Sequence, residues 1–391
     1  MEIRVRLADL ALRIGIAALA MLLAVSFGAV KAQGFYFGVD LSSVNAREAC
    51  GATFRENGVT RDPFALFASR GANLVRVRLW NDPSGWTDFG NLSDVEKTIA
   101  RAKAQKMKVL LDFHYSDRWA DASSQIVPGA WRGITSDAEL AKTLYQYTGL
   151  VLLTLDRAGL MPDLVQIGNE TNSELMMRAP WTAGRSIDWK RNALLFAAAI
   201  RAVHDASART SIKPKIILHI AQPENVEAWL DQATAAGVSG FDIIGISYYA
   251  KWSKLDLAAM GAEVRHVRAK YGVDVMIVET AYPATLDYTG FPNPDPDKGE
   301  TLTAAQTLVP GFPATPQGQN DYMVKLTQIV MSNGGIGVIY WEPARVDVNC
   351  WPRARTDGDK GWQNATVFDR YGNIFPSFQY MLRHYDAGTN R

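Results

Sequence analysis

Two glutamates close strand-like segments that are otherwise apolar. Glu170 follows the run LVQIGN, and Glu279 follows the run VMIV. Burying an unpaired carboxylate is costly, so a charge at the end of such a run needs a partner or a chemical role. Two carboxyl groups facing each other across a cleft are typical of glycoside hydrolysis, in which one is the general acid and the other the nucleophile or base. For either glutamate alone, the alternative is a cap on the following helix.

Further polar and aromatic side chains lie near the ends of other strand-like runs and are candidate binding or supporting residues. They are Arg76, Trp80, Asp112, His114, Asn169, His219, Tyr248, Tyr249, Trp341 and Glu342. Other chemistries find less support. The five His residues form no H-x-H or H-E-x-x-H motif, which disfavours a zinc site. The sequence has no G-x-S-x-G motif, which disfavours a serine hydrolase. Schiff-base chemistry requires a lysine in the site, but Lys108 and Lys215 lie at strand starts, away from the expected site.

Eight β-branched or apolar runs alternate with segments of helical periodicity, the pattern of βα units around a parallel sheet. The eight runs span residues 35–42, 73–80, 108–115, 164–170, 215–220, 241–249, 274–282 and 337–343. The pattern predicts the α/β class and a single (β/α)8 TIM barrel, with long loops at the C-terminal face of the strands. A doubly wound sheet is the alternative, but no G-x-G-x-x-G follows the first run.

Four of the intervening segments carry clear helix signals. Residues 91–105 begin with Asn and Ser and end with basic residues, and residues 137–159 form a long amphipathic stretch. Residues 224–237 and 320–334 each end at Gly. We expect helices over these ranges, each packed outside the barrel.

The first 32 residues have the order of a secretory signal. Basic residues precede an apolar run over residues 14–30, and Val30-Lys31-Ala32 is a small-x-small cleavage pattern. An uncleaved anchor is the alternative, although this run is shorter than the roughly 20 residues of a typical span. We therefore expect a signal peptide over 1–32, a catalytic domain over 33–391, and a secreted or periplasmic protein with no membrane contact after cleavage.

Charge and aromatic content indicate the kind of partner. The chain has 41 Lys and Arg against 40 Asp and Glu, with no block of one sign, which disfavours nucleic acid as a partner. We expect a neutral partner and a monomeric protein. Eight of the 11 Trp residues fall at strand ends or in the loops after strands: Trp80, Trp86, Trp119, Trp131, Trp252, Trp341, Trp351 and Trp362. Aromatic rings beside paired carboxylates favour a carbohydrate cleft, and the alternative is that several cover the barrel rim.

The only two cysteines follow the first and the eighth strand-like runs. Cys50 and Cys350 would therefore lie in loops of neighbouring strands once a barrel closes. In an exported protein such a pair can form a disulfide, which we expect here. The alternative is two unpaired thiols.

Seven segments, in order, resemble glycoside hydrolase family 53, the arabinogalactan endo-β-1,4-galactanases. They are GVDLSSV (38–44), VRVRLWNDP (75–83), LLDFHYSDRWADASSQIVPGAW (110–131), VQIGNET (165–171), IGISYYAKW (244–252), VETAYP (278–283) and YWEPA (340–344). The resemblance implies a (β/α)8 barrel that cleaves β-1,4-galactan, a pectin side chain, with retention of configuration. It also implies Glu170 as acid/base and Glu279 as nucleophile, with Arg76 keeping Glu279 ionised. Trp341 would lie beneath the reacting sugar.

Two positions depart from the family pattern. Arg345 stands where members usually have Trp, which removes an aromatic ring near the cleft. Some bacterial members bind calcium after strands seven and eight, but the acidic spacing of that site is absent. We expect no cofactor, and Asp295, Asp297, Asp357 and Asp359 are the weak calcium candidates.

Three other functions stay open at this point. A β-mannanase or a β-glucanase of the same clan would share the paired glutamates. A non-catalytic carbohydrate-binding barrel would be expected to lack one of the carboxylates or Arg76, and all three residues are present.

Overall fold

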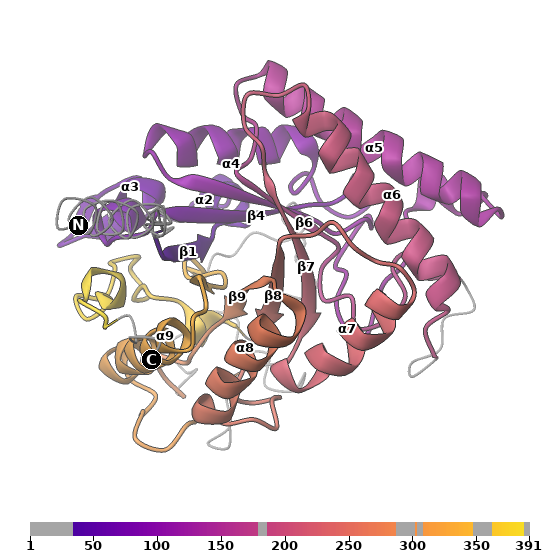
Figure 1. The fold of residues 1–391 in the computed structure, drawn as a ribbon. Coiled ribbons are helices and arrows are strands. Elements are labelled where there is room, and N and C mark those ends of the chain that lie inside the picture. Colours follow the sequence, from indigo (N-terminus) through magenta and orange to yellow (C-terminus); the bar gives the residue numbers. More distant parts are fainter. Residues whose placement is uncertain (1–33, 179–185, 287–301, 303–307, 347–361, 387–391) are drawn as a thin grey trace, which may run out of the picture. The chain divides into compact units, whose positions relative to one another are not determined.

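The structure is a computed structural model, and it describes residues 34–178, 186–286, 302, 308–346 and 362–386. From Phe35 onward the described chain clusters into one compact unit. Figure 1 shows strands at the centre of this unit and helices around them.

Eight parallel strands form a closed barrel in the order β1-β10-β9-β8-β7-β6-β5-β4. Their bounds are β1 Tyr36–Asp40, β4 Leu74–Leu79, β5 Lys108–Phe113, β6 Leu164–Ile167, β7 Lys215–Ala221, β8 Ile243–Ser247, β9 Asp274–Thr280 and β10 Gly337–Tyr340. Strand β1 closes the ring by pairing Val39 with Tyr340 on β10 and with Val75 on β4. Each of the eight predicted runs matches one barrel strand, and only β7 extends one residue beyond its run, so the predicted (β/α)8 fold is confirmed.

Helices follow the strands along the chain. Their bounds are α2 Val44–Ala49, α3 Pro63–Ser69, α4 Leu92–Ala104, α5 Asp137–Arg157, α6 Trp189–Ser207, α7 Val226–Ala235, α8 Leu257–Tyr271 and α9 Pro316–Ser332. The side chain of Asn91 caps α4 as its sequence predicts. Helix α9 begins four residues before the predicted start, because Thr315 accepts a capping hydrogen bond and Pro316 occupies the first turn.

A short hairpin was not predicted. Strands β2 (Arg55–Glu56) and β3 (Val59–Thr60) pair antiparallel. They are joined by Asn57 and Gly58, with φ of 51° and 79°. An Asn-Gly pair is a strong signal for a two-residue hairpin turn, but the flanking strands have only two residues each and show no usable alternation.

The barrel interior consists of an apolar layer with a polar layer above it. The apolar layer is a cluster of Tyr36, Leu74, Leu110, Leu164, Ile217, Ile243, Met276, Val278 and Ile339. Because side chains alternate along a strand, the residue two positions later faces the same side. On β4, β5, β6 and β7 that residue is polar: Arg76, Asp112, Gln166 and His219. The strands thus place these polar side chains at the C-terminal mouth of the barrel.

Several predictions fall on residues outside the described ranges. These are the signal over residues 1–32, the calcium candidates Asp295, Asp297, Asp357 and Asp359, Cys350, and Trp351 among the predicted tryptophans. Cys50 immediately follows α2, and its pairing with Cys350 stays a prediction. Within the described ranges, no helix is long and apolar enough to span a membrane. In the same ranges, no group of three or more potential ligand side chains could hold a metal ion.

Candidate active site

Arg76 is the centre of the polar layer. Its guanidinium is 1% exposed and lies 2.9 Å from Asp40, 2.8 Å from Asp112 and 2.8 Å from Glu279. It also donates to Asn169 Oδ1 at 2.7 Å. Burial lowers the pKa of Arg76, but its carboxylate partners outweigh burial and the net shift is upward. A permanent positive charge therefore lies beneath the C-terminal mouth of the barrel.

Glu279 lies on β9, and both of its carboxylate oxygens have a partner. Oε1 pairs with Arg76 Nη1 at 2.8 Å, and Oε2 accepts a hydrogen bond from the Tyr249 hydroxyl at 3.3 Å. The contact with Arg76 agrees with what the family resemblance implies. The pKa of Glu279 is raised to about 8. Burial is the largest cause of this shift, Arg76 opposes it, and the charge of Glu170 adds to it. Arg76 favours the ionised form of Glu279, the direction that the family resemblance implies, but burial raises the pKa of this carboxyl group by more than Arg76 lowers it.

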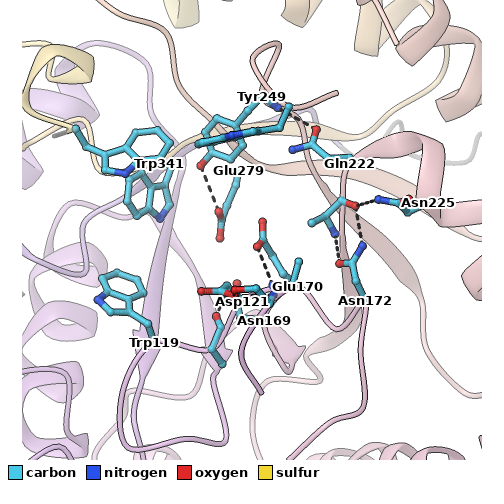
Figure 2. Close-up of a pocket in the computed structure, with 16 residues that line it drawn as sticks. Trp119, Asp121, Asn169, Glu170, Asn172, Gln222, Asn225, Tyr249, Glu279 and Trp341 are labelled. Carbon is cyan, nitrogen blue, oxygen red and sulfur yellow. Dashed lines mark hydrogen bonds between the residues drawn. The ribbon is translucent and has the colours of Figure 1, made fainter. Parts of the chain in front are cut away.

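Glu170 follows β6 in a left-handed backbone conformation, with φ of 46°. Its Oε1 accepts a hydrogen bond from Ser247 Oγ at 2.6 Å, and its Oε2 accepts one from the Ala122 amide at 3.3 Å. Burial raises the pKa of Glu170, the bond from Ser247 lowers it, and the charge of Asp121 raises it. Figure 2 shows the carboxyl groups of Glu170 and Glu279 directed toward one another. Because they interact, their protons titrate as a pair.

Gly168 makes the turn that places Glu170. It has φ of 76°, and a Cβ there would lie 2.5 Å from Thr171 Cγ2 and 3.0 Å from Leu175 Cδ1. Only glycine avoids both the strained backbone and these contacts. The segment IGNE therefore turns the chain sharply from β6 so that the next carboxyl group points into the barrel mouth.

A network of hydrogen bonds on β5 and the loop after it supports the floor of the site. Asp112 lies 3.1 Å from His114 Nε2, so this nitrogen carries the proton. His114 Nδ1 accepts from the Ala120 amide at 3.1 Å and from Trp80 Nε1 at 3.3 Å. The predicted residues Trp80, Asp112 and His114 are thus brought together, and they anchor the loop after β5 rather than facing open space.

A cavity of about 690 Å³ lies over the two glutamates. Four tryptophans line it: Trp119, Trp252, Trp341 and Trp362. The rings of Trp341 and Trp362 are 4.8 Å apart, and those of Trp119 and Trp341 are 6.3 Å apart. In Figure 2, Trp119 and Trp341 lie on one side of the glutamates. Flat rings beside paired carboxyl groups form a surface suited to the C–H faces of a sugar.

Comparison with known proteins agrees with this geometry. The sequence profile described as Glycosyl hydrolase family 53 matches residues 36–381. The chain belongs to this family. The hydrolase is 46% identical over 380 residues to a Cellvibrio japonicus (strain Ueda107) protein named arabinogalactan endo-beta-1,4-galactanase, with 96% of this chain and 98% of that protein covered. It is 34% identical over 357 residues to a Bacillus subtilis (strain 168) protein named endo-beta-1,4-galactanase, with 88% and 76% covered.

A solved structure shares the architecture of this family 53 hydrolase. The catalytic domain of an Ignisphaera aggregans family 53 protein matches with a TM-score of 0.77 at 32% identity. The match covers 90% of this chain and 96% of that one. The predicted family and the predicted barrel are therefore both confirmed.

Some predicted site residues of the hydrolase lie behind the cavity wall. Tyr248 is 1% exposed, and its hydroxyl donates to the Leu255 carbonyl at 3.0 Å. Both tyrosines follow β8, and of the two only Tyr249 reaches Glu279. Glu342 is buried against Arg78 at 2.8 Å and accepts a bond from the Ser43 hydroxyl. These contacts support the rim and do not line the cavity.

Arg345, which replaces the usual Trp of the family, is fully buried. Its guanidinium lies 4.9 Å from the centre of the Trp341 ring. The charge therefore packs against the face of an aromatic residue that lines the cavity. The pKa of Arg345 is lowered to about 9. Burial is the largest cause of this shift, the charge of Arg47 adds to it, and Glu342 opposes it.

Five polar cavity residues were not predicted: Asp121, Ser123, Asn172, Gln222 and Asn225. Asn172 and Asn225 both donate to the Ala221 carbonyl, at 2.9 and 2.8 Å, which makes a small rigid cluster of amides. Gln222 has φ of 62°, a conformation that its sequence does not signal. The amides lie on the opposite side of Glu170 from Trp119 and Trp341 (Figure 2).

Proposed function

We propose that this family 53 hydrolase is an endo-acting β-1,4-galactanase that cleaves the galactan side chains of type I arabinogalactan with retention of configuration. The supporting observation is the pair Glu170 and Glu279 beneath one tryptophan-lined cavity. The names of the Cellvibrio and Bacillus relatives support the substrate. A neutral polymer also suits a chain with a formal net charge of +1.

In the first step, Glu279 attacks the anomeric carbon and forms a glycosyl ester. The glycosidic C–O bond breaks, and the proton of Glu170 moves to the departing oxygen. Arg76 and Tyr249 contact the Glu279 oxygens and orient the nucleophile. Because the site must contain one proton and one negative charge, the raised pKa of the pair suits operation near neutral pH.

In the second step, water attacks the anomeric carbon of the glycosyl ester. Glu170, now ionised, accepts the proton of that water, and the bond from carbon to Glu279 breaks. Glu279 has lost its charge to the ester at this stage, so the charge that raised the pKa of Glu170 is absent. The same carboxyl group can therefore serve as acid and then as base.

Residue roles follow from position. Trp341 would be the platform under the reacting sugar, because it lines the cavity beside the glutamates. Asn169 would contact the sugar 2-hydroxyl with its free amide proton, since its side chain already donates to the Ala120 carbonyl at 2.8 Å. We also propose that the protein acts as a monomer after export to the periplasm or beyond, on the basis of the signal-like order of residues 1–32.

A substrate panel tests the proposal. Release of reducing ends is measured on unbranched β-1,4-galactan, β-1,4-mannan and β-1,4-glucan under the same conditions. We expect hydrolysis of galactan with early products of several lengths, as endo action requires. Preferential hydrolysis of mannan or glucan would replace the galactanase assignment with one of the alternatives, and no hydrolysis of any polymer would favour a binding barrel.

A further inference from the structure

The hydroxyl of Ser247 lies between two buried groups of the site. Ser247 is the last residue of β8 and is fully buried. Its Oγ lies 2.6 Å from Glu170 Oε1 and 2.8 Å from His219 Nε2. Ser247 is absent from the residues that line the cavity, so it reaches Glu170 from inside the barrel wall.

The surroundings of His219 define its protonated nitrogen. The backbone amide of Glu170, which can only donate, lies 3.2 Å from Nδ1. The side-chain nitrogen of Gln166 is 3.0 Å from the same nitrogen, but it also donates to Asp112 Oδ1 at 2.6 Å and to the Gly168 carbonyl at 3.0 Å, so the amide of Glu170 decides the assignment. Asn169 Oδ1 is also 3.0 Å away, but it already accepts from Arg76. Burial lowers the pKa of His219 well below its ordinary value. The neutral ring therefore accepts at Nδ1 and carries its proton on Nε2.

This tautomer directs the Ser247 proton. His219 Nε2–H donates to Ser247 Oγ, so the single proton of the serine is available to Glu170 Oε1. A hydroxyl that accepts one bond and donates another has a defined orientation. Oε1 of Glu170 therefore accepts the Ser247 proton in a hydrogen bond.

The other oxygen of Glu170 faces the cavity. Oε2 accepts a bond of 3.3 Å from the amide of Ala122, and Ala122 is one of the cavity residues. A proton on Oε2 can reach a glycosidic oxygen in the cavity, whereas a proton on Oε1 would point at Ser247 inside the barrel wall.

We propose that Ser247, oriented by His219, is a positioning residue that keeps the transferable proton of Glu170 on Oε2. This inference rests on the proposed acid/base role of Glu170. The serine hydroxyl stabilises the ionised carboxylate, which must form when the leaving group is protonated and must act as base in the second step.

Several charged or titratable groups also face Glu170, from other elements of the barrel. They are Arg76 on β4, Asp121 after β5, His219 on β7, Tyr249 after β8 and Glu279 on β9. Arg76 favours the ionised form of Glu170, whereas Asp121 and Glu279 oppose it. These three groups act on Glu170 through their charge. Ser247 differs because its hydroxyl donates a hydrogen bond directly to Glu170 Oε1.

The test compares Ser247→Ala with Ser247→Thr, which keeps the hydroxyl. In the alanine variant we expect the basic limb of the kcat/KM profile on β-1,4-galactan to move upward by about one pH unit, since loss of a donor destabilises the ionised form. We expect kcat to fall about tenfold with KM changed less than about twofold, because proton transfer is affected more than binding. The threonine variant should resemble the wild type.

Thr148→Val is the matched control, because Thr148 is also a fully buried hydroxyl but bonds to Tyr115 on the outer side of the barrel. We expect its pH profile to equal that of the wild type. An alanine variant whose basic limb stays at the wild-type pH would overturn the proposal, as would a threonine variant that fails to restore the limb while remaining folded by circular dichroism.

A second measurement separates this inference from the proposed function. The ¹³C-carboxyl resonance of Glu170, assigned by its loss in Glu170→Gln, is titrated in the wild type and in Ser247→Ala. We expect a higher midpoint in the alanine variant even on a substrate-free protein, and equal midpoints would overturn the role of Ser247. Failure of the wild type to hydrolyse galactan would count against the galactanase assignment alone. If Ser247→Ala does not fold, Ser247→Cys, a weak donor, is titrated in its place with the same expected direction.

Discussion

Arg76 Nη1 lies 2.8 Å from Glu279 Oε1, yet the pKa of Glu279 is raised to about 8. The ion pair and the upward shift coexist because burial raises the pKa of Glu279 more than Arg76 lowers it, and Arg76 is also shared with other carboxylates. Its guanidinium also contacts Asp40 and Asp112, so one positive charge serves three buried carboxylates. Glu279 therefore lies in a region with excess negative charge and little water, where burial favours the neutral form.

The first prediction concerns pH dependence. Catalysis needs one proton on the pair of Glu170 and Glu279, and the pKa of both carboxyl groups is raised, that of Glu279 to about 8. We expect a bell-shaped profile of kcat/KM whose basic limb falls as pH rises through about 8, because the general acid is then lost. At low pH both carboxyls are protonated, and the rate falls because the nucleophile is neutral.

The control for this profile is Asp121→Asn. The charge of Asp121 raises the pKa of Glu170, so its removal should move the basic limb to lower pH. This direction is opposite to the one expected for Ser247→Ala. A basic limb near pH 5 in the wild type would contradict the raised pKa of the pair.

The second prediction concerns stability. Arg76→Met removes the positive charge shared by Asp40, Asp112 and Glu279, all of which are buried. We expect the free energy of unfolding in urea to fall by about 3–5 kcal/mol, the usual cost of leaving buried charges unpaired. Arg76 lowers the pKa of Asp40 and of Glu279, so without it the protonated forms of these two carboxyl groups are favoured. The loss of stability should therefore be larger at pH 8 than at pH 5.

Arg76→Lys is the comparison for this measurement. It retains a positive charge but cannot contact the same partners with a planar fork, so an intermediate loss is expected. Equal stability of Arg76→Met and the wild type at pH 8 would show that the buried carboxyls do not depend on Arg76.

The third prediction separates two tryptophans of the cavity. Trp341 is 9% exposed and lies beside the glutamates, whereas Trp252 is 44% exposed. We expect Trp341→Ala to lower kcat/KM on galactan by about thirtyfold, from the loss of roughly 2 kcal/mol of ring contact at the reacting sugar. Trp252→Ala should mainly raise KM for the polymer, by a few-fold. Trp189→Phe is the control, because Trp189 packs on Trp229 and lines none of this cavity.

The sequence predicted the barrel because each strand is a short apolar run with regular spacing. It also predicted much of the floor of the site. Arg76, Asp112 and His219 each come two residues after an apolar-layer residue on the same strand, so strand alternation directs their side chains into the barrel as well. Glu170 and Glu279 were recognisable because a charge ends an apolar run in each case.

The remaining residues depend on loop conformations that local sequence does not signal. Tyr115, Glu170, Gln222 and Glu342 all follow barrel strands with positive φ, although none is glycine. Such backbones persist only where surrounding contacts stabilise them. Asn172 and Asn225 reach the cavity through these turns, so their positions follow from tertiary contacts. Tyr248 was expected at the site because it ends a strand-like run, but its hydroxyl bonds to the Leu255 carbonyl and its neighbour Tyr249 contacts Glu279 instead.

The most direct test of the two-glutamate mechanism is azide rescue of Glu170→Ala and Glu279→Ala on an aryl β-galactooligosaccharide with a good leaving group. Without the nucleophile, azide can enter only from the face that Glu279 occupied, so Glu279→Ala should give an α-glycosyl azide. Glu170→Ala still forms the glycosyl ester at Glu279, which azide opens with a second inversion to give a β-glycosyl azide. Azides of these opposite configurations, identified by ¹H NMR, are the predicted result. Wild-type rates in either variant without azide, or azides of the reverse configurations, would contradict the proposed roles.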